Sequence, residues 1–244
     1  FIVKNNTSIF PYTLHLADNV LILGHRLSEW CGHGPVLEQD IAITNMSLDL
    51  VGQARMYYQY AAELEGQGRT EDDMAYLRDI DEYRNFLLVE QPNGDWGQTL
   101  TRQFFFDAWH YFLLKGLLDS QDEQLRAIAE KSLKEVTYHL RYSSEWMIRL
   151  GDGTEESHRR MQTAVDKLWP FTGELFEDTE LDTAMAEAGI APPLSALKPK
   201  WETRVKEVLE QATLQQPDNN WMQSGGKTTK QHTEHLGFIL AELQ

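Results

Sequence analysis

The 244-residue sequence contains a single cysteine, Cys31, so no disulfide forms within the chain. It also lacks an apolar run of about eighteen residues and a basic-then-apolar leader, which are the marks of a membrane span and a secretory signal. These absences predict a cytoplasmic protein that does not enter a membrane.

Positive charge is scarce as well. The chain has 22 Lys and Arg residues against 38 Asp and Glu residues, and its formal net charge is -16. Phosphate backbones and anionic membrane surfaces repel such a chain at long range, so we expect no nucleic-acid partner. The same excess argues against binding of a polyphosphate cofactor by this chain alone. With 41% apolar and 25% charged residues, the composition is that of a globular protein, which excludes disorder of the whole chain.

The alternation of apolar and polar residues that marks β-strands is hard to find, whereas apolar residues recur at helical spacing. This pattern predicts an all-α chain. Helices are expected over residues 11–30, 35–65, 70–85, 97–118, 122–150, 154–176, 181–188 and 194–214, with a tail from residue 225 that ends helically. Four long helices with short connections predict an antiparallel four-helix bundle that carries additional C-terminal helices.

No linker or internal repeat divides the sequence, so we expect one helical domain over residues 11–244. Residues 1–10 fit neither a signal peptide nor a natural start, and are expected to be a loose arm or a remnant foreign to the natural chain. His232 and His235 lie in the tail, where surface roles are commoner than metal ligation.

Bundles build metal sites from inward-facing acids and histidines on facing helices. A di-iron site takes one Glu from each of two helices and a Glu-x-x-His pair from each of the other two. Asp107 and His110 have the acid-x-x-His spacing on a helix that is aromatic over most of its circumference, so Asp107 is expected to be buried. Glu135 and His139 are four residues apart, and His139 borders the apolar stripe of its helix.

The remaining ligand positions are apolar or neutral. Leu50 and Gln53 stand where the second long helix would supply a Glu and a His, and Val136 stands where the fourth would supply a Glu. Leucine and valine bind no metal. The residues therefore indicate a bundle shaped like a di-iron protein without a complete metal site.

Five segments carry a more specific signal: RLSEWCGH (26–33), LDLVGQAR (48–55), LLVEQPNG (87–94), FDAWH (106–110) and KEVTYHLR (134–141). In this order they resemble the C subunits of bacterial ring-1,2-phenylacetyl-CoA epoxidases, from about Tyr12 to Gln244. The resemblance implies a ferritin-like fold. It also implies a non-catalytic structural subunit that supports a homologous A subunit, which carries the di-iron centre of this monooxygenase of phenylacetate degradation.

When the sequence is aligned with the ligand pattern of the catalytic subunit, Leu50 and Val136 occupy positions of ligand Glu residues, and Gln53 occupies the position of a ligand His. Asp107 and His139 are the two ligand positions that keep a metal-binding residue type. The resemblance thus implies no catalytic, cofactor-binding or metal-binding residue on this chain. Two hypotheses compete with it. One is a self-contained metalloenzyme that uses Asp107, His110, Glu135 and His139, and the other is a helical scaffold outside the epoxidase.

The resemblance further implies a dimer of heterodimers, additional small subunits, and a separate reductase with flavin, an iron–sulfur cluster and NADPH. This chain would contact phenylacetyl-CoA only within the complex. Candidate contacts at the edge of the substrate site are Glu82, Tyr83, Arg84 and Asn85. The second long helix and its tyrosines, Tyr57, Tyr58 and Tyr60, are candidates for the pairing surface.

An unpartnered buried carboxylate costs several kcal/mol, which constrains the bundle centre. We therefore expect Asp107 and His139 to form a hydrogen-bonded polar cluster with Gln53, His110 or an arginine such as Arg55.

Overall fold

The computed structural model describes residues 2–218 and 221–244, and the side chains of the first helix from Ile9 onward. Within these ranges every regular element is a helix, and no strand is present. The all-α prediction is therefore confirmed.

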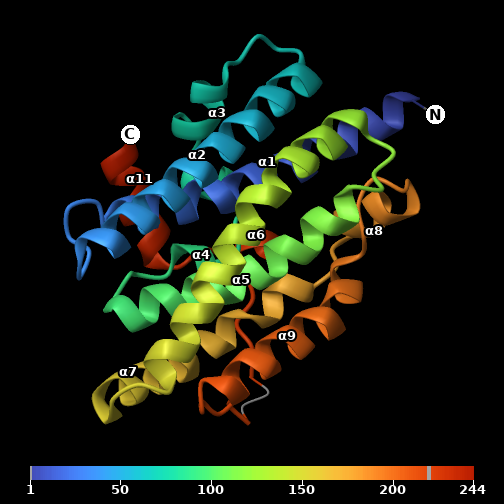
Figure 1. Ribbon diagram of the computed structural model, residues 1–244. Helices are drawn as coiled ribbons and strands as arrows, with labels where there is room; N and C mark the ends of the chain where they lie inside the picture. The colour runs from blue at the N-terminus through green and yellow to red at the C-terminus, as the bar shows by residue number, and fades with distance from the viewer. Residues whose placement is uncertain (1, 219–220) are drawn as a thin grey trace.

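Four long helices form the bundle: α1 (Ile2–Ser28), α2 (Leu37–Glu65), α5 (Trp96–Leu117) and α6 (Glu123–Gly151). The most extensive contacts join α1 to α2 and α5 to α6, so the bundle consists of two antiparallel pairs, which Figure 1 shows side by side. Packing of α2 against α6 connects the pairs. This arrangement is the ferritin-like bundle that the sequence predicts.

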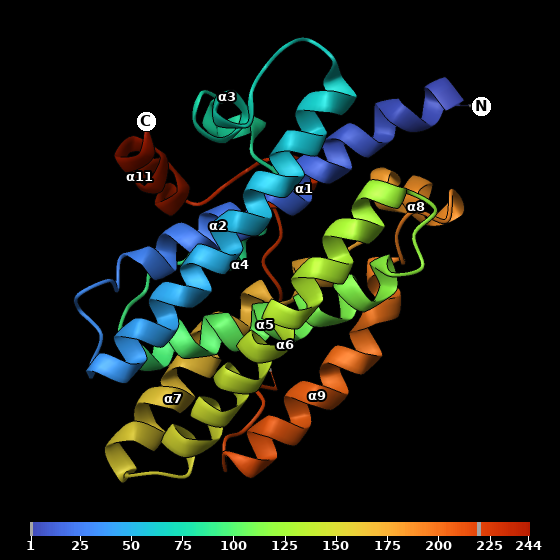
Figure 2. The same cartoon turned by 45° about the horizontal axis from the view of Figure 1, so that its top comes forward.

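Shorter elements surround the bundle: α3 (Glu71–Tyr76), η1 (Ile80–Glu82), α4 (Leu87–Glu90), α7 (Glu155–Leu168), η2 (Trp169–Phe171), η3 (Gly173–Phe176), α8 (Glu180–Glu187), η4 (Leu194–Leu197), α9 (Lys198–Gln211), α10 (Gly226–Thr229) and α11 (Glu234–Leu243). Helix α3 packs on α2, helices α4 and α8 pack on α1, and helices α7 and α9 cover α5 and α6 (Figure 2).

Helix α5 is central because aromatic side chains occupy most of its circumference and nearly all of its residues are buried. Phe104, Phe105 and Phe106 are consecutive and all fully buried. A helix with only one buried face would expose at least one of three consecutive side chains. Side-chain caps fix where the two helices of this pair begin: Asp95 accepts the Gln98 amide, and Asp122 accepts the Leu125 amide.

The first helix begins earlier than the sequence predicts. The structure continues α1 back to Ile2, across Pro11, so residues 2–10 are helical rather than loose. Pro11 removes one backbone donor, and in the same turn the Thr13 hydroxyl donates to the Ile9 carbonyl at 2.8 Å. Phe1 lies outside the described residues. The division into residues 1–10 and a domain of 11–244 stays a prediction.

The helix expected over residues 70–85 is wrong beyond Tyr76, where α3 ends. The chain is extended at Tyr83 and Phe86 because side chains of α1 bind its amides. Asp18 accepts the Arg84 amide at 2.8 Å, and Asn19 accepts the Phe86 amide at 2.9 Å. Such long-range partners override a local helical pattern.

The C-terminal segment is held by two buried carboxylates. Glu90 accepts hydrogen bonds from His232 Nδ1 at 2.9 Å and the Thr233 amide at 2.6 Å. Glu174 accepts the amides of Leu87 at 2.9 Å and Lys227 at 2.8 Å. The expectation of a surface role for His232 is therefore wrong, because this side chain is buried against Glu90.

Asp18 is the third carboxylate of this kind. It accepts hydrogen bonds from the Tyr58 hydroxyl at 2.6 Å, from both terminal nitrogens of Arg78 and from the Arg84 amide. Asp18 and Arg78 are both buried, so neither charge has water as an alternative partner. One carboxylate thus connects α1, α2 and the chain that follows α3.

Replacement of Asp18 by alanine leaves the Arg78 guanidinium buried without its carboxylate. We expect the free energy of unfolding to fall by about 3–5 kcal/mol in urea titrations. The matched substitution Asp119→Ala, at an exposed carboxylate, is expected to change it by about 0.5 kcal/mol or less. Equal effects of the two substitutions would contradict this role for Asp18.

Candidate functional site in the bundle centre

The five positions that the sequence places at the centre are all fully buried. Leu50 and Gln53 lie on α2, Asp107 lies on α5, and Val136 and His139 lie on α6. Spacings of three residues on α2 and α6 aim both members of each pair toward one side of the helix, as in a di-iron protein. The structure therefore puts the predicted set on the inward faces of three helices.

Asp107 is partnered by neutral donors. Gln103 Nε2 donates to Asp107 Oδ1 at 2.6 Å, and the Ser143 hydroxyl donates to Asp107 Oδ2 at 2.8 Å. Burial raises the pKa of Asp107 to about 6, and the nearby His139 and these two hydrogen bonds offset only part of that rise. The predicted burial of Asp107 is confirmed, but its hydrogen-bond partners are not the ones expected.

His139 and Gln53 connect the centre to the edge of the bundle. His139 Nε2 donates to Asp49 Oδ2 at 2.9 Å, and Gln53 Nε2 donates to Glu135 Oε2 at 2.8 Å. Asp49 is half-buried, with 35% of its side chain exposed, so its charge is partly solvated. Each buried donor thus reaches a carboxylate at the α2–α6 boundary.

His110 lies beside this cluster in an aromatic environment. Its ring centroid is 5.2 Å from that of Phe106 and 6.2 Å from that of Trp109. Burial, together with nearby His139, lowers the pKa of His110 to about 3, so the ring is neutral near pH 7. The expectation that Arg55 joins the cluster is wrong, since its exposed guanidinium pairs with Glu71 at 3.2 Å.

A di-iron centre does not fit these residues. Leu50 and Val136 have no donor atom, and both oxygens of Asp107 already accept hydrogen bonds from neutral donors. Within residues 2–218 and 221–244, no three His, Cys, Asp or Glu side chains are grouped so that they could hold a metal ion. The donor set therefore supports a polar core that is only partly hydrogen-bonded, since Gln53 Oε1 and His139 Nδ1 have no partner among the described residues.

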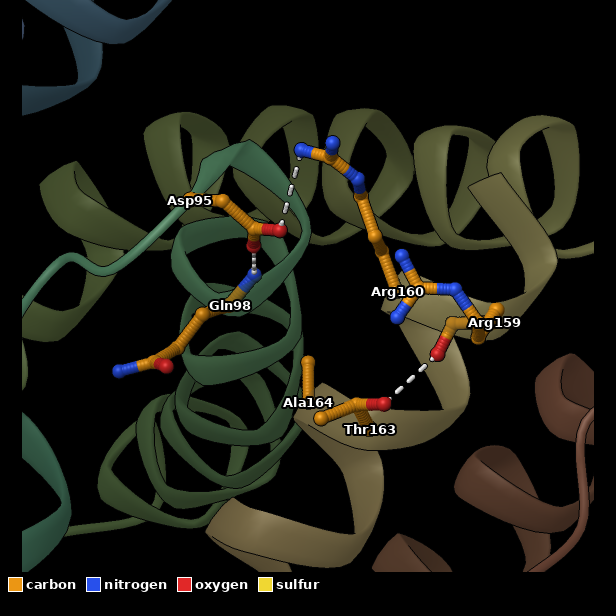
Figure 3. Close-up of a pocket in the computed structure, with 6 residues that line it drawn as sticks. All are labelled: Asp95, Gln98, Arg159, Arg160, Thr163 and Ala164. Carbon is orange, nitrogen blue, oxygen red and sulfur yellow. Dashed lines mark hydrogen bonds and ion pairs between the residues drawn. The ribbon is translucent and has the colours of Figure 1, made fainter. Parts of the chain in front are cut away.

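Several surface cavities lie away from this centre. The cavity in Figure 3 lies between the start of α5 and α7 and contains two arginines, Arg159 and Arg160. Arg160 is 3.6 Å from the capping residue Asp95, and both arginines pair with Glu156. Because these charges are neutralised within the chain, the cavity has little attraction for an anion.

The candidate contacts at residues 82–85 are only partly available. Tyr83 and Asn85 are fully buried, and their side chains bond the Ala75 carbonyl and Glu90. Glu82 caps its own short helix by accepting the Asp79 amide. Arg84 lines a surface cavity.

The expected pairing role of the α2 tyrosines is not supported by their positions. Tyr57 and Tyr58 are core residues with 1% exposure. Tyr60 is partly buried and donates to Asp122 at 2.5 Å. The exposed apolar residues of α2 lie at its other end.

Sequence reasoning missed the partners Gln103, Ser143 and Asp49. Gln103 precedes Asp107 by four residues, and Ser143 follows His139 by four, so helical spacing could have found both. Asp49 points sideways from α2 toward α6, and no spacing rule within one helix reveals that contact.

These features define a class: a ferritin-like helical bundle whose centre, within the described residues, groups no set of metal ligands. The chain belongs to the family described as "Phenylacetic acid catabolic protein", whose profile matches residues 2–244. It is 51% identical over 233 residues to a curated protein of Escherichia coli (strain K12), the C subunit of 1,2-phenylacetyl-CoA epoxidase. The match covers 96% of this chain and 93% of that protein, which confirms the resemblance found in the sequence.

The lengths and sequences of the helices test whether any of them could cross a membrane. Among the helices of the described residues, none combines the length and the apolarity that a bilayer crossing requires.

The raised pKa of Asp107 predicts a specific dependence of stability on pH. Because the folded pKa of about 6 exceeds the ordinary value of 3.8, the carboxyl's favourable contribution is complete below about pH 3.8 and is lost as pH rises through about 6. We expect Asp107→Asn to gain about 2–3 kcal/mol over the unmodified protein between about pH 4 and pH 7, at about 1.4 kcal/mol per pKa unit.

Urea unfolding across this pH range measures the gain, with Asp119→Asn as the exposed control. A stability difference between Asp107→Asn and the unmodified chain that does not change with pH would show that Asp107 is not destabilised by its burial.

Proposed function

We propose that this chain is a non-catalytic, structural subunit of a multicomponent 1,2-phenylacetyl-CoA epoxidase. In this role it binds and supports a homologous catalytic subunit that carries a di-iron centre. The name of the relative, which is one subunit of such an enzyme, supports the assignment. Membership of the phenylacetic acid catabolic family supports the placement in phenylacetate catabolism.

The observation that carries the proposal is the chemistry of the bundle centre. Leu50 and Val136 fill two positions at which a di-iron protein needs carboxylates, and both side chains are fully buried. The fold of an enzyme is thus retained while the ligand set of the enzyme is absent. A chain of this kind contributes through its surface rather than through its interior.

We assign the contact with the catalytic subunit to an exposed apolar ridge on α2, formed by Leu37, Ile41 and Leu48. These side chains are 72%, 51% and 65% exposed, and their spacing places them on one face of the helix. Farther along the same face the exposed side chains are polar: Arg55 and Gln59 bond Glu71 of α3 at 3.2 Å and 3.1 Å. The ridge is therefore the apolar half of an exposed helix face, and an exposed apolar patch bordered by polar residues is typical of a protein–protein interface.

The proposal also includes the rest of the assembly that the resemblance implies. It comprises a dimer of heterodimers, further small subunits, and a reductase that supplies electrons through flavin, an iron–sulfur cluster and NADPH. The formal charge of -16 supports a division of labour in which the catalytic chain provides most of the contacts to the anionic coenzyme A thioester. A cytoplasmic location belongs to the same proposal.

Co-expression with the catalytic subunit tests both the proposal and the ridge. We expect the two chains to co-purify and Leu48→Asp to weaken their association about tenfold or more, since a charge enters a desolvated apolar contact. The matched control is Leu77→Asp, because Leu77 is 74% exposed but lies after α3, away from the ridge. This control is expected to leave the association unchanged.

The variants separate two ways of failing. If the unmodified chains do not co-purify, and epoxidation proceeds without this chain, the structural-subunit assignment is wrong. If Leu77→Asp disrupts the complex and Leu48→Asp does not, the assignment stands and the contact lies near α3 instead.

A further inference from the structure

A surface cavity lies where α8 and α10 approach α1. It has a volume of about 370 Å³ and is lined by His15, Arg84, Thr179, Glu180, Leu181, Lys227 and Thr228. These residues come from α1, the extended segment after η1, α8 with its N-cap, and α10. The volume lies within the range of small-molecule sites.

His15 lines this cavity and has an unused acceptor. Its Nδ1 lies 2.7 Å from the Arg84 carbonyl, which can only accept, so Nδ1 carries the hydrogen. Burial and the neighbouring Lys227 lower the pKa of His15 to about 4, so near neutral pH the ring is uncharged and Nε2 is an acceptor. Nε2 is buried and has no hydrogen-bond partner among the described residues.

The charged groups around His15 restrict which hydrogen-bond donor a ligand can offer to His15 Nε2. Asp182 Oδ1 is likewise buried without a partner, while Asp182 Oδ2 pairs with the Lys227 ammonium. Lys227 also donates to the Glu177 carbonyl at 3.1 Å and is itself almost fully buried. An ammonium ligand would be repelled by Lys227, whereas a hydroxyl donates a hydrogen bond without adding charge.

The mouth of the cavity favours an anion on one side. Arg84 bonds its neighbours only through its backbone, and its half-buried guanidinium makes no hydrogen bond within the part of the chain that the structure describes. A guanidinium binds carboxylates through two parallel hydrogen bonds. Glu180 is exposed at the lip, so water screens its charge and it repels an anion only weakly.

We propose that this cavity binds a small hydroxylated carboxylic acid, whose hydroxyl donates to His15 Nε2 and whose carboxylate faces Arg84. The site is separate from the bundle centre and from the α2 ridge, so it does not depend on the proposed role in an epoxidase. A ligand there joins α1 to α8 and α10, three elements that are far apart in sequence.

Isothermal titration of the full chain near neutral pH with two matched pairs of probes tests the proposal. The pairs are 4-hydroxyphenylacetate with phenylacetate, and 3-hydroxybutyrate with butyrate. We expect at least one hydroxylated member to bind about tenfold or more tightly than its partner, because the partner leaves His15 Nε2 unsatisfied. The expected effect of Arg84→Gln is a loss of about tenfold in the affinity for that acid, with Arg149→Gln, at an exposed arginine of α6, as the unaffected control.

His15→Phe is expected to abolish the preference for the hydroxyl, and thermal unfolding of each variant checks that it is folded. Should His15→Phe fail to fold, Arg84→Gln and the probe pairs still decide the question. Equal affinity within both pairs, binding of no probe, or unchanged affinity in Arg84→Gln contradicts the proposal. A crystal structure grown with the hydroxylated acids that shows only an ordered water on His15 Nε2 contradicts it as well.

Discussion

A carboxylate in the middle of a helical bundle must have partners, and the identity of those partners decides what the bundle can do. Asp107 is fully buried and accepts hydrogen bonds from Gln103 and Ser143, which carry no charge. A metal ion would need several carboxylates at this point, but Leu50 and Val136 bring only hydrocarbon. The centre therefore lacks the carboxylates of a di-iron site, although Gln53 Oε1, Gln103 Oε1 and His139 Nδ1 are buried there without a partner among the described residues.

The same constraint shapes the outer layer of the molecule. Asp18, Glu90 and Glu174 are each buried, and each accepts at least one backbone amide from a segment far away in sequence. A carboxylate that accepts several amides is stabilised without a metal and at the same time fixes the course of the chain. These three residues hold the extended segment after η1 and the C-terminal helices against α1. The cavity at His15 lies where this outer layer meets α1, whereas the α2 ridge lies on the bundle itself.

Helical periodicity predicted the four long helices because each buries a stripe of its own side chains. It also placed Leu50, Asp107 and Val136 correctly in the core, since spacing along one helix determines which residues share its inward face. The extended stretch at Tyr83 to Phe86 could not be predicted in this way, because it depends on Asp18 and Asn19, more than sixty residues earlier. The burial of His232 against Glu90 is a long-range contact of the same kind.

The central claim, that this chain keeps the bundle of a di-iron enzyme without its metal chemistry, is tested most directly by iron analysis. The chain is purified alone and in complex with the catalytic subunit, dialysed against chelator, and assayed for iron per polypeptide. We expect no retained iron in the isolated chain, and in the complex only the iron of the catalytic subunit. Stoichiometric iron that survives dialysis of the isolated chain and is lost in Asp107→Ala would contradict the claim.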